Sequence, residues 1–401
     1  MPRPPANDSH GGDAEAEERP IGQRRELRIL ALALVLAMST WFSTAAVLGQ
    51  LTVEWSLGSA AKSWLIIVLQ LGFVVGAAGS SVANLADRIP PRRLMLIGTT
   101  GAAIANAAII PLDAYGPALG ARFMTGVFLA AVYPPALKAM SSWYRAGRGH
   151  ALGVMIGALT LGSALPHLIN GIGELDWQVV IGATSLLTLV GGLFAERLGS
   201  DGPYATKASP FDPAKLRSVI ANREFRLASL GYFGHMWELY AMWAWIAAFY
   251  GDVFTNQRSA SIAAFGTIGI GAFGSVYVGA LSDRQQRSSA AELAMRWSAL
   301  ASLVTGFLVG APPAFVLMVG LVWGFWVVAD SAQFSTIVTE VVEPQSVGTA
   351  LTLQLAIGFV LTVLTIFLVP VVRDASNWGF AFMMLAPGPI VGAFAMRASA
   401  T

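Results

Sequence analysis

The chain has 401 residues, of which 55% are hydrophobic and only 12% are charged. Soluble domains carry about 25% charged residues, so this composition cannot cover a surface that faces water. The mean hydropathy of +0.62 comes from repeated apolar runs of about 20 residues, the length that a helix needs to cross a bilayer. The sequence therefore predicts a multi-pass protein of the cytoplasmic (plasma) membrane.

Composition and motifs also exclude several classes of function. The net charge of +2 does not indicate a nucleic-acid partner, because the basic residues lie at helix ends instead of on one folded face. The absence of cysteine excludes disulfides, thiolate metal sites and cysteine nucleophiles. No phosphate loop, nucleophile elbow or HExxH pattern occurs, so we expect no enzyme, no cofactor and no metal.

The chain divides into a tail, two apolar halves and a polar linker. Residues 1–26 are polar and are expected to form a disordered cytoplasmic tail. The N-terminal half, 27–198, is expected to hold six membrane helices, at 28–51, 63–86, 93–111, 117–140, 151–172 and 179–198. A cytoplasmic linker with a short interfacial helix follows at 199–224. The C-terminal half, 225–397, is expected to hold six more helices, at 225–250, 259–281, 291–309, 313–338, 348–371 and 378–396.

The distribution of basic residues predicts the orientation of this all-α membrane protein. If the N-terminus is cytoplasmic, the outer loops contain only Lys62, Arg258 and Arg373, and Arg122 lies within a helix. The inner side then holds 21 of the 25 lysine and arginine residues. Because cytoplasmic loops retain positive charge, both termini are expected to be cytoplasmic.

One polar turn occurs twice and indicates two pseudo-symmetric halves. Its first copy reads VANLADRIPPRRLM and contains Asp87, and its second copy reads VGALSDRQQR and contains Asp283, 196 positions later. A second echo pairs GHA at 149–151 with GTA at 348–350, at an offset of 199. Two echoes at nearly one offset indicate an internal duplication.

These motifs resemble those of the major facilitator superfamily, over residues 28–397. The family turn reads roughly GxxxDRxGRRxxL, and its matches here are Asp87, Arg88, Arg92, Arg93 and Leu94. Ala83, Pro90 and Pro91 depart from it, and the second copy keeps only Gly279, Asp283 and Arg284. In the fourth helix, Arg122 followed by Gly126 also fits the family.

The resemblance implies a twelve-helix secondary transporter that works by alternating access, with its site near the midplane between the halves. It also implies a gating cluster that locks the outward-facing state, at Asp87, Arg88, Arg92, Arg93, Asp283 and Arg284. The alternative is that the positive-inside rule alone explains these arginines, although it does not explain the repeated acid.

Three ionisable residues at membrane depth are candidates for proton coupling, because an ionisable group there is costly unless it has a role. His235 and Glu238 are three positions apart on one helical face, and Glu238 lies roughly 20 Å into its helix. A low-dielectric site favours the protonated carboxyl, as proton coupling needs, so Glu238→Gln is expected to abolish proton-driven uptake. Alternatively, Glu238 is a protonated group that only hydrogen-bonds to His235 or a neighbouring helix. The third candidate is Asp330.

Aromatic and polar residues near these acids are candidates for the substrate site. Trp323 and Trp326 precede Asp330 by seven and four positions and are expected to share its face, which Gln333 continues. This wall would bind a cation or an organic ring, or shield a proton site; alternatively, the tryptophans only pack between helices. The weaker candidates for lining the cavity are Trp41, Gln70, Tyr133 and Tyr240.

Arg122 and His167 have two interpretations each. The resemblance implies that Arg122 stabilises a helix interface or tunes a nearby acid, whereas its fixed charge would also attract an anionic substrate. His167 follows a proline in the fifth helix and is either a packing residue or a proton carrier.

Together these features predict a proton-coupled transporter, with symport the expected mode, for a small organic anion or polar metabolite. Its expected partners are this small molecule, protons and the lipid bilayer, with no nucleic acid, and it is expected to be a monomer. Nitrate is disfavoured, because the second and eighth helices lack embedded arginines. The alternatives are proton-coupled efflux of lipophilic drugs and a membrane sensor that does not transport.

Overall fold

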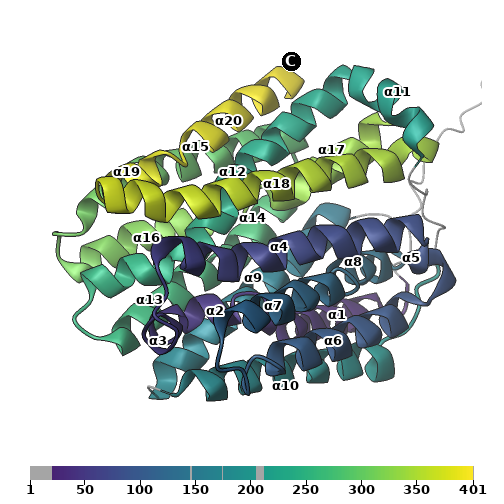
Figure 1. The fold of residues 1–401 in the computed structure, drawn as a ribbon. Helices are drawn as coiled ribbons and strands as arrows, with labels where there is room; N and C mark the ends of the chain where they lie inside the picture. The colour runs from purple at the N-terminus through teal and green to yellow at the C-terminus, as the bar shows by residue number, and fades with distance from the viewer. Residues whose placement is uncertain (1–19, 145–146, 174, 205–211, 401) are drawn as a thin grey trace, which may run out of the picture.

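The computed structural model describes residues 20–144, 147–173, 175–204 and 212–400. Most of the expected N-terminal tail lies outside the described residues, and so do the side chains of Ala86, Asp87 and Leu198. Every regular element in the described part of the chain is a helix, which confirms the predicted all-α class (Figure 1).

The N-terminal helices follow the predicted order, but two crossings are broken. The bounds are α1 (Gln23–Ala37), η1 (Met38–Thr40), α2 (Ser43–Ala46), α3 (Leu48–Glu54), α4 (Ser59–Val82), α5 (Leu85–Arg88), α6 (Pro91–Ala107), α7 (Tyr115–Leu129), α8 (Tyr133–Ser141), α9 (Arg148–Gly173) and α10 (Trp177–Leu198). The first crossing therefore runs from α1 to α3 with a break after Thr40, and the fourth crossing divides into α7 and α8.

The linker and the C-terminal helices also occur in the predicted order. The bounds are η2 (Pro213–Lys215), α11 (Leu216–Ala221), α12 (Arg223–Val253), α13 (Gln257–Gly269), α14 (Gly271–Ser282), α15 (Arg287–Thr305), η3 (Gly306–Leu308), α16 (Pro313–Val327), α17 (Ser331–Val341), η4 (Pro344–Ser346), α18 (Val347–Ala375), α19 (Trp378–Met383) and α20 (Pro387–Ala400). Asp330 lies in the break between α16 and α17, inside the tenth predicted crossing.

Eight stretches of the described chain are long and apolar enough to cross a membrane. They are 59–82, 115–141, 148–173, 177–197, 257–282, 313–341, 344–375 and 378–400. The other four predicted crossings contain the helices α1, α6, α12 and α15, which are shorter or less apolar. The structure is thus consistent with twelve crossings.

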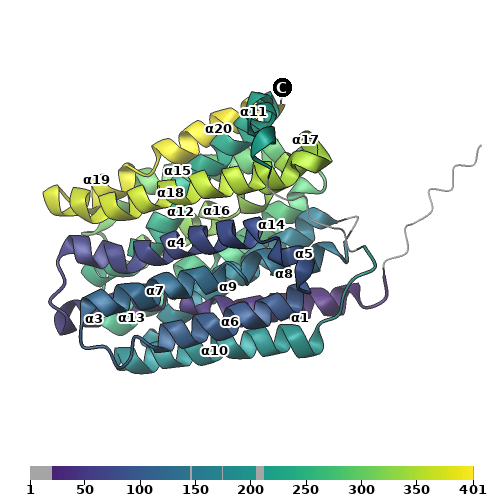
Figure 2. The same ribbon diagram turned by 45° about the vertical axis from the view of Figure 1, so that its right-hand side comes forward.

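The helices of the two halves meet along two long seams. In one seam α9 lies along α13 and α14, and in the other α4 lies along α18. Figures 1 and 2 show that α4 and α18 diverge toward the end of the molecule where α5 and α17 lie. In the first seam, α9 instead stays in contact with α13 at one end and with α14 at the other.

Glycines permit the close approach of α9 to α14. A Cβ atom added to Gly153 would lie 2.5 Å from the carbonyl oxygen of Ser275, far inside van der Waals contact. At one end of this seam the Asp283 carboxylate accepts hydrogen bonds from the backbone N–H groups of Gly149, at 3.0 Å, and His150, at 2.8 Å. The C-terminal half therefore caps the first turn of α9 in the N-terminal half.

The opposite end of the same seam is also held by hydrogen bonds. The Asn170 amide donates to the hydroxyl oxygen of Ser261, at 3.1 Å, and to the carbonyl oxygen of Ala46, at 2.8 Å. Asn170 thus joins α9 to the first crossing in its own half and to α13 in the other half.

Candidate functional site

An aromatic cluster fills the contact between the two halves near the middle of the helices. Its members are Trp41, Phe42, Phe73, Tyr240, Trp243 and Phe359. The first three belong to the N-terminal half and the last three to the C-terminal half. Ring centroids across the interface lie 4.8 Å apart for Phe73 and Phe359 and 5.9 Å apart for Trp41 and Tyr240.

Several buried polar atoms lack a hydrogen-bond partner within the described part of the chain. In the described part of the chain they include the indole nitrogens of Trp41 and Trp243 and side-chain atoms of Thr44, Gln70, Ser163, His167 and Gln333. All seven side chains are at least nine-tenths buried. Such atoms usually have a partner, and those of Trp41 and Trp243 belong to rings that meet across the two halves, which is typical of a ligand site.

Ser163 and His167 lie one turn apart on α9, on the side away from Ile172, which is 63% exposed. The exposed Ile172 marks the surface that faces lipid, so the hydroxyl and the imidazole point toward the interior. Neither nitrogen of the His167 ring has a partner among the described residues. The residue is therefore a better candidate for a site than the sequence alone indicates.

Both terminal nitrogens of Arg122 are hydrogen-bonded inside the N-terminal half, whereas its Nε has no partner in the described part of the chain. Its Nη1 donates to the carbonyl oxygen of Thr40 and to Oδ1 of Asn106, both at 3.1 Å, and to Oγ of Ser43 at 3.3 Å. Its Nη2 donates to the carbonyl oxygen of Trp41 at 2.7 Å. The guanidinium thus satisfies the carbonyls that the break in the first crossing leaves without helical partners.

Asn106 extends this anchor to the neighbouring helix. Its Oδ1 also accepts from the hydroxyl of Ser43, at 3.0 Å, and its amide donates to Ser185 on α10, at 3.0 Å. The network fixes the backbone that presents Trp41 to the other half. Asn106 was not expected from the sequence, although an amide inside an apolar run is a signal that could have identified it.

Glu238 lies at the centre of three helices of the C-terminal half. Its Oε2 accepts from the hydroxyl of Ser298 on α15, and its Oε1 accepts from the indole N–H of Trp323 on α16, both at 2.7 Å. The side chain is 1% exposed. Both carboxyl oxygens therefore have a donor, and the residue links α12 to α15 and α16.

His235 and Asp330 form a different kind of pair. Nδ1 of His235 lies 2.8 Å from Oδ1 of Asp330, but without the alignment of a hydrogen bond. Both side chains are buried, and Nε2 of His235 has no partner in the described chain. The break between α16 and α17 positions Asp330, and Gln333 one turn later has an unpartnered amide.

Trp326 does not share a surface with Trp323, contrary to the prediction. Its ring stacks on Trp297 at 6.3 Å and packs edge-on against Tyr277, and those two residues are 46% and 52% exposed. Positions three apart on a helix differ by about 60° in direction, which here separates the buried Trp323 from a residue near the lipid surface. Tyr133 lies at the start of α8 and is half-buried.

The turn residues lie apart from the aromatic cluster. Arg92 donates to the carbonyl oxygens of Glu196, at 3.2 Å, and Gly199, at 2.7 Å, within its own half. Arg88, Arg93 and Arg284 are exposed. Of this predicted gating cluster, the structure brings only Asp283 into a described contact between the halves.

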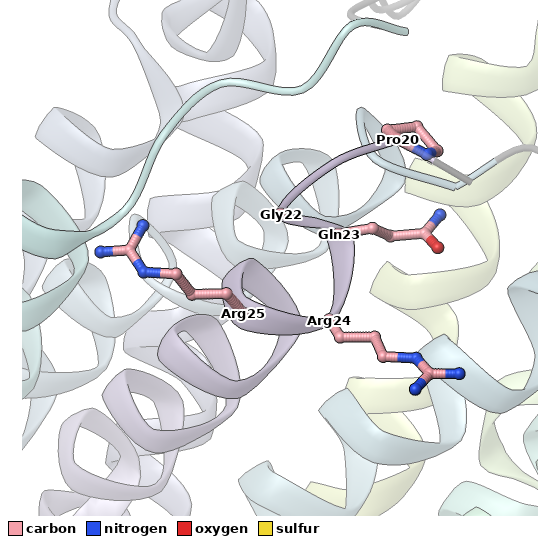
Figure 3. Close-up of a pocket in the computed structure, with 5 residues that line it drawn as sticks. All are labelled: Pro20, Gly22, Gln23, Arg24 and Arg25. Atoms are coloured by element: carbon pink, nitrogen blue, oxygen red, sulfur yellow. The ribbon is translucent and has the colours of Figure 1, made fainter. Parts of the chain in front are cut away.

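A shallow depression at the start of α1 does not belong to the site. It is lined by Pro20, Gly22, Gln23, Arg24 and Arg25 (Figure 3). The two arginine side chains point in different directions, so they do not converge on one ligand.

Two bundles of apolar helices that meet along two seams, with aromatic rings packed between them, are the architecture of a membrane transporter. A family model of the Major Facilitator Superfamily matches residues 30–365, so the chain belongs to that superfamily, as the turn motifs predicted.

Similar proteins fit this assignment. The multidrug efflux pump LfrA of Mycolicibacterium smegmatis (strain ATCC 700084 / mc(2)155) is 28% identical over 200 residues, which are 47% of this chain and 38% of the pump. The match thus spans well under half of that relative's length.

Two solved structures of a bacterial homolog of the human lysosomal transporter Spinster share the fold. The inward-facing unoccupied form has a TM-score of 0.66, and the match covers 96% of both chains. The inward-facing occupied form has a TM-score of 0.68 and covers 95% of this chain and 97% of that one. Both are 15% identical to this chain.

Proposed function

We propose that this protein is a proton-coupled secondary transporter in which His235 and Asp330 exchange the coupling proton. The observation that carries the proposal is their 2.8 Å approach at the break of the tenth crossing, with a ring nitrogen left open. An imidazolium beside a carboxylate is a balanced pair, whereas loss of its proton leaves one uncompensated charge in a low-dielectric site. Proton loss is thus expected to loosen the contact between α12 and α17.

Glu238 has a positioning role in this proposal. Because Ser298 and Trp323 occupy both of its oxygens, it holds α12, α15 and α16 around the proton-exchanging pair.

Of the two cargo classes expected from the sequence, the contacts of Arg122 favour the lipophilic one. Its guanidinium is the only buried basic group in the described chain other than histidine, and backbone carbonyls occupy both of its terminal nitrogens. Because these carbonyl oxygens hold both terminal nitrogens at the first crossing, an anion at the aromatic cluster could not form a bidentate contact with the guanidinium, and its burial would stay costly. Export of lipophilic compounds also agrees with the name of the similar efflux pump.

The orientation is part of the same proposal. Both termini are placed on the cytoplasmic side of the plasma membrane, because this arrangement leaves 21 of 25 lysine and arginine residues inside.

Reconstituted protein tests the proton assignment. We expect His235→Asn and Asp330→Asn to abolish accumulation driven by a pH gradient while counterflow of the cargo persists, because only the coupling step needs the proton. The control is Asp113→Asn, since Asp113 is an exposed acid outside the site. Accumulation at the wild-type level in both His235→Asn and Asp330→Asn would refute the assignment.

A further inference from the structure

We infer that the aromatic cluster is the closed form of a subsite for an uncharged aromatic compound that carries a hydrogen-bond acceptor such as a carbonyl oxygen. This inference rests on the proposed transport function and specifies its cargo. It follows from three properties of the cluster: its place between the halves, its two open indole donors, and the absence of a charged group among its own six side chains.

The position makes the cluster accessible during the transport cycle. Every ring of the N-terminal set contacts a ring of the C-terminal set, for example Phe42 and Trp243, whose centroids are 5.8 Å apart. Alternating access requires the halves to rock about their shared interface. The ring faces that now touch one another must then separate, and a planar ligand can replace these contacts with stacking of similar strength.

The open donors specify what the ligand must offer. An indole N–H only donates, and those of Trp41 and Trp243 are buried with no acceptor among the residues that the structure describes. By contrast, Trp245 donates to the carbonyl oxygen of Ile366 at 3.0 Å and Trp323 donates to Glu238 at 2.7 Å. An unpaired buried donor costs free energy that a ligand acceptor would recover.

The two donors lie in one connected set of rings. Trp41 and Trp243 both contact Tyr240, with centroid distances of 5.9 Å and 5.8 Å. Gln70, one turn before Phe73 on α4, adds an amide whose oxygen and nitrogen are both unpartnered. A bicyclic ligand with a carbonyl group would therefore meet ring faces and donors together.

The charges around the cluster disfavour an ionic ligand. The guanidinium of Arg122 is held behind the first crossing by the carbonyl oxygens of Thr40 and Trp41. On the other side, both oxygens of Glu238 accept hydrogen bonds from protein donors. An uncharged ligand has the smallest desolvation cost in such a site.

Calorimetry on the full chain in nanodiscs, with empty nanodiscs subtracted, tests this inference with four bicyclic probes. They are 2-naphthamide, which is neutral with a carbonyl; naphthalene, which lacks the carbonyl; 2-naphthoate, an anion; and N-methylquinolinium, a cation. We expect 2-naphthamide to bind about 10-fold more tightly than each of the others, since one ordinary hydrogen bond corresponds to about 5- to 10-fold in affinity.

Two variants assign the binding to the indole donors. Trp41→Phe and Trp243→Phe keep an aromatic ring but remove the N–H, and each should weaken 2-naphthamide about 5- to 10-fold. Trp64→Phe is the matched control, because Trp64 on α4 is 41% exposed at the lipid surface. Naphthalene should bind the two site variants and the wild-type protein with similar affinity.

The results separate this inference from the proposed function. Equal affinity of all four probes for the wild-type protein, or tightest binding of 2-naphthoate or N-methylquinolinium, overturns the inference even if a site variant does not fold. Unchanged 2-naphthamide binding in both folded variants also overturns it. Proton coupling is measured separately in the His235 and Asp330 variants, so either proposal can fail alone.

Discussion

Replacing Glu238 distinguishes a positioning carboxyl from a proton carrier. In Glu238→Gln the amide oxygen can accept from the indole N–H of Trp323 while its nitrogen donates to the hydroxyl oxygen of Ser298, because a hydroxyl both donates and accepts. Both contacts thus survive, and we expect a loss of less than about 1 kcal/mol in the free energy of unfolding. Glu238→Ala instead leaves the Trp323 donor unpaired and creates a cavity, which costs about 2–5 kcal/mol together.

The transport assay then separates the two roles. If Glu238 positions its neighbours, Glu238→Gln retains accumulation driven by a pH gradient in proteoliposomes, and Glu238→Ala loses it along with thermal stability. This expectation replaces the one drawn from the sequence, in which the glutamine variant loses proton-driven uptake. Loss of proton-driven accumulation in a stable Glu238→Gln variant that retains counterflow would make Glu238 the proton carrier and refute our reasoning.

Three further predictions concern the supports of the site. Arg122→Ala should lower the free energy of unfolding by about 2–4 kcal/mol, because it leaves buried carbonyls unpaired. Wild-type stability of Arg122→Lys would show that the four hydrogen bonds of the guanidinium are not needed for stability. Asp283→Asn should weaken the cap on α9 by about 1 kcal/mol. It should also broaden the distribution of distances between spin labels on the exposed ends of α4 and α14. An unchanged distribution would contradict a role for Asp283 in holding the two halves together. Gly153→Ala should lower stability by about 1–3 kcal/mol by clashing with the carbonyl oxygen of Ser275, as seen in thermal unfolding, whereas Gly79→Ala, with open space around it, should not.

The sequence is sufficient to predict the helices and the family, because hydropathy and repeated turns depend on local patterns. It also identifies His235 and Asp330, which the structure brings together, since a buried acid and a histidine are rare in apolar runs. Which of them touch depends on helix rotation and on breaks that a period of 3.6 residues does not reveal. Trp326 illustrates this limit, because its spacing predicted a place beside Asp330 and its ring lies instead against the exposed Trp297.

Partners from distant helices are the second part that the sequence does not reveal. Ser298 and Asn106 are ordinary polar residues in apolar helices, and only the packing brings them to Glu238 and Arg122. The same holds for Phe359, whose ring meets Phe73 from the other half of the chain. Such side chains can be recognised as important only when the fold shows what they contact.

The anchor around Arg122 has a consequence for how this protein can diversify. The guanidinium donates hydrogen bonds to the main-chain oxygens of residues 40 and 41 and not to their side chains. Every amino acid has such an oxygen, so these contacts do not depend on which side chain occupies either position. Substitutions at Trp41 can therefore change the lining of the proposed subsite while the hydrogen bonds that hold the break in the first crossing are kept. Position 41 is therefore the starting point that we suggest for changing the specificity of the proposed subsite by directed evolution.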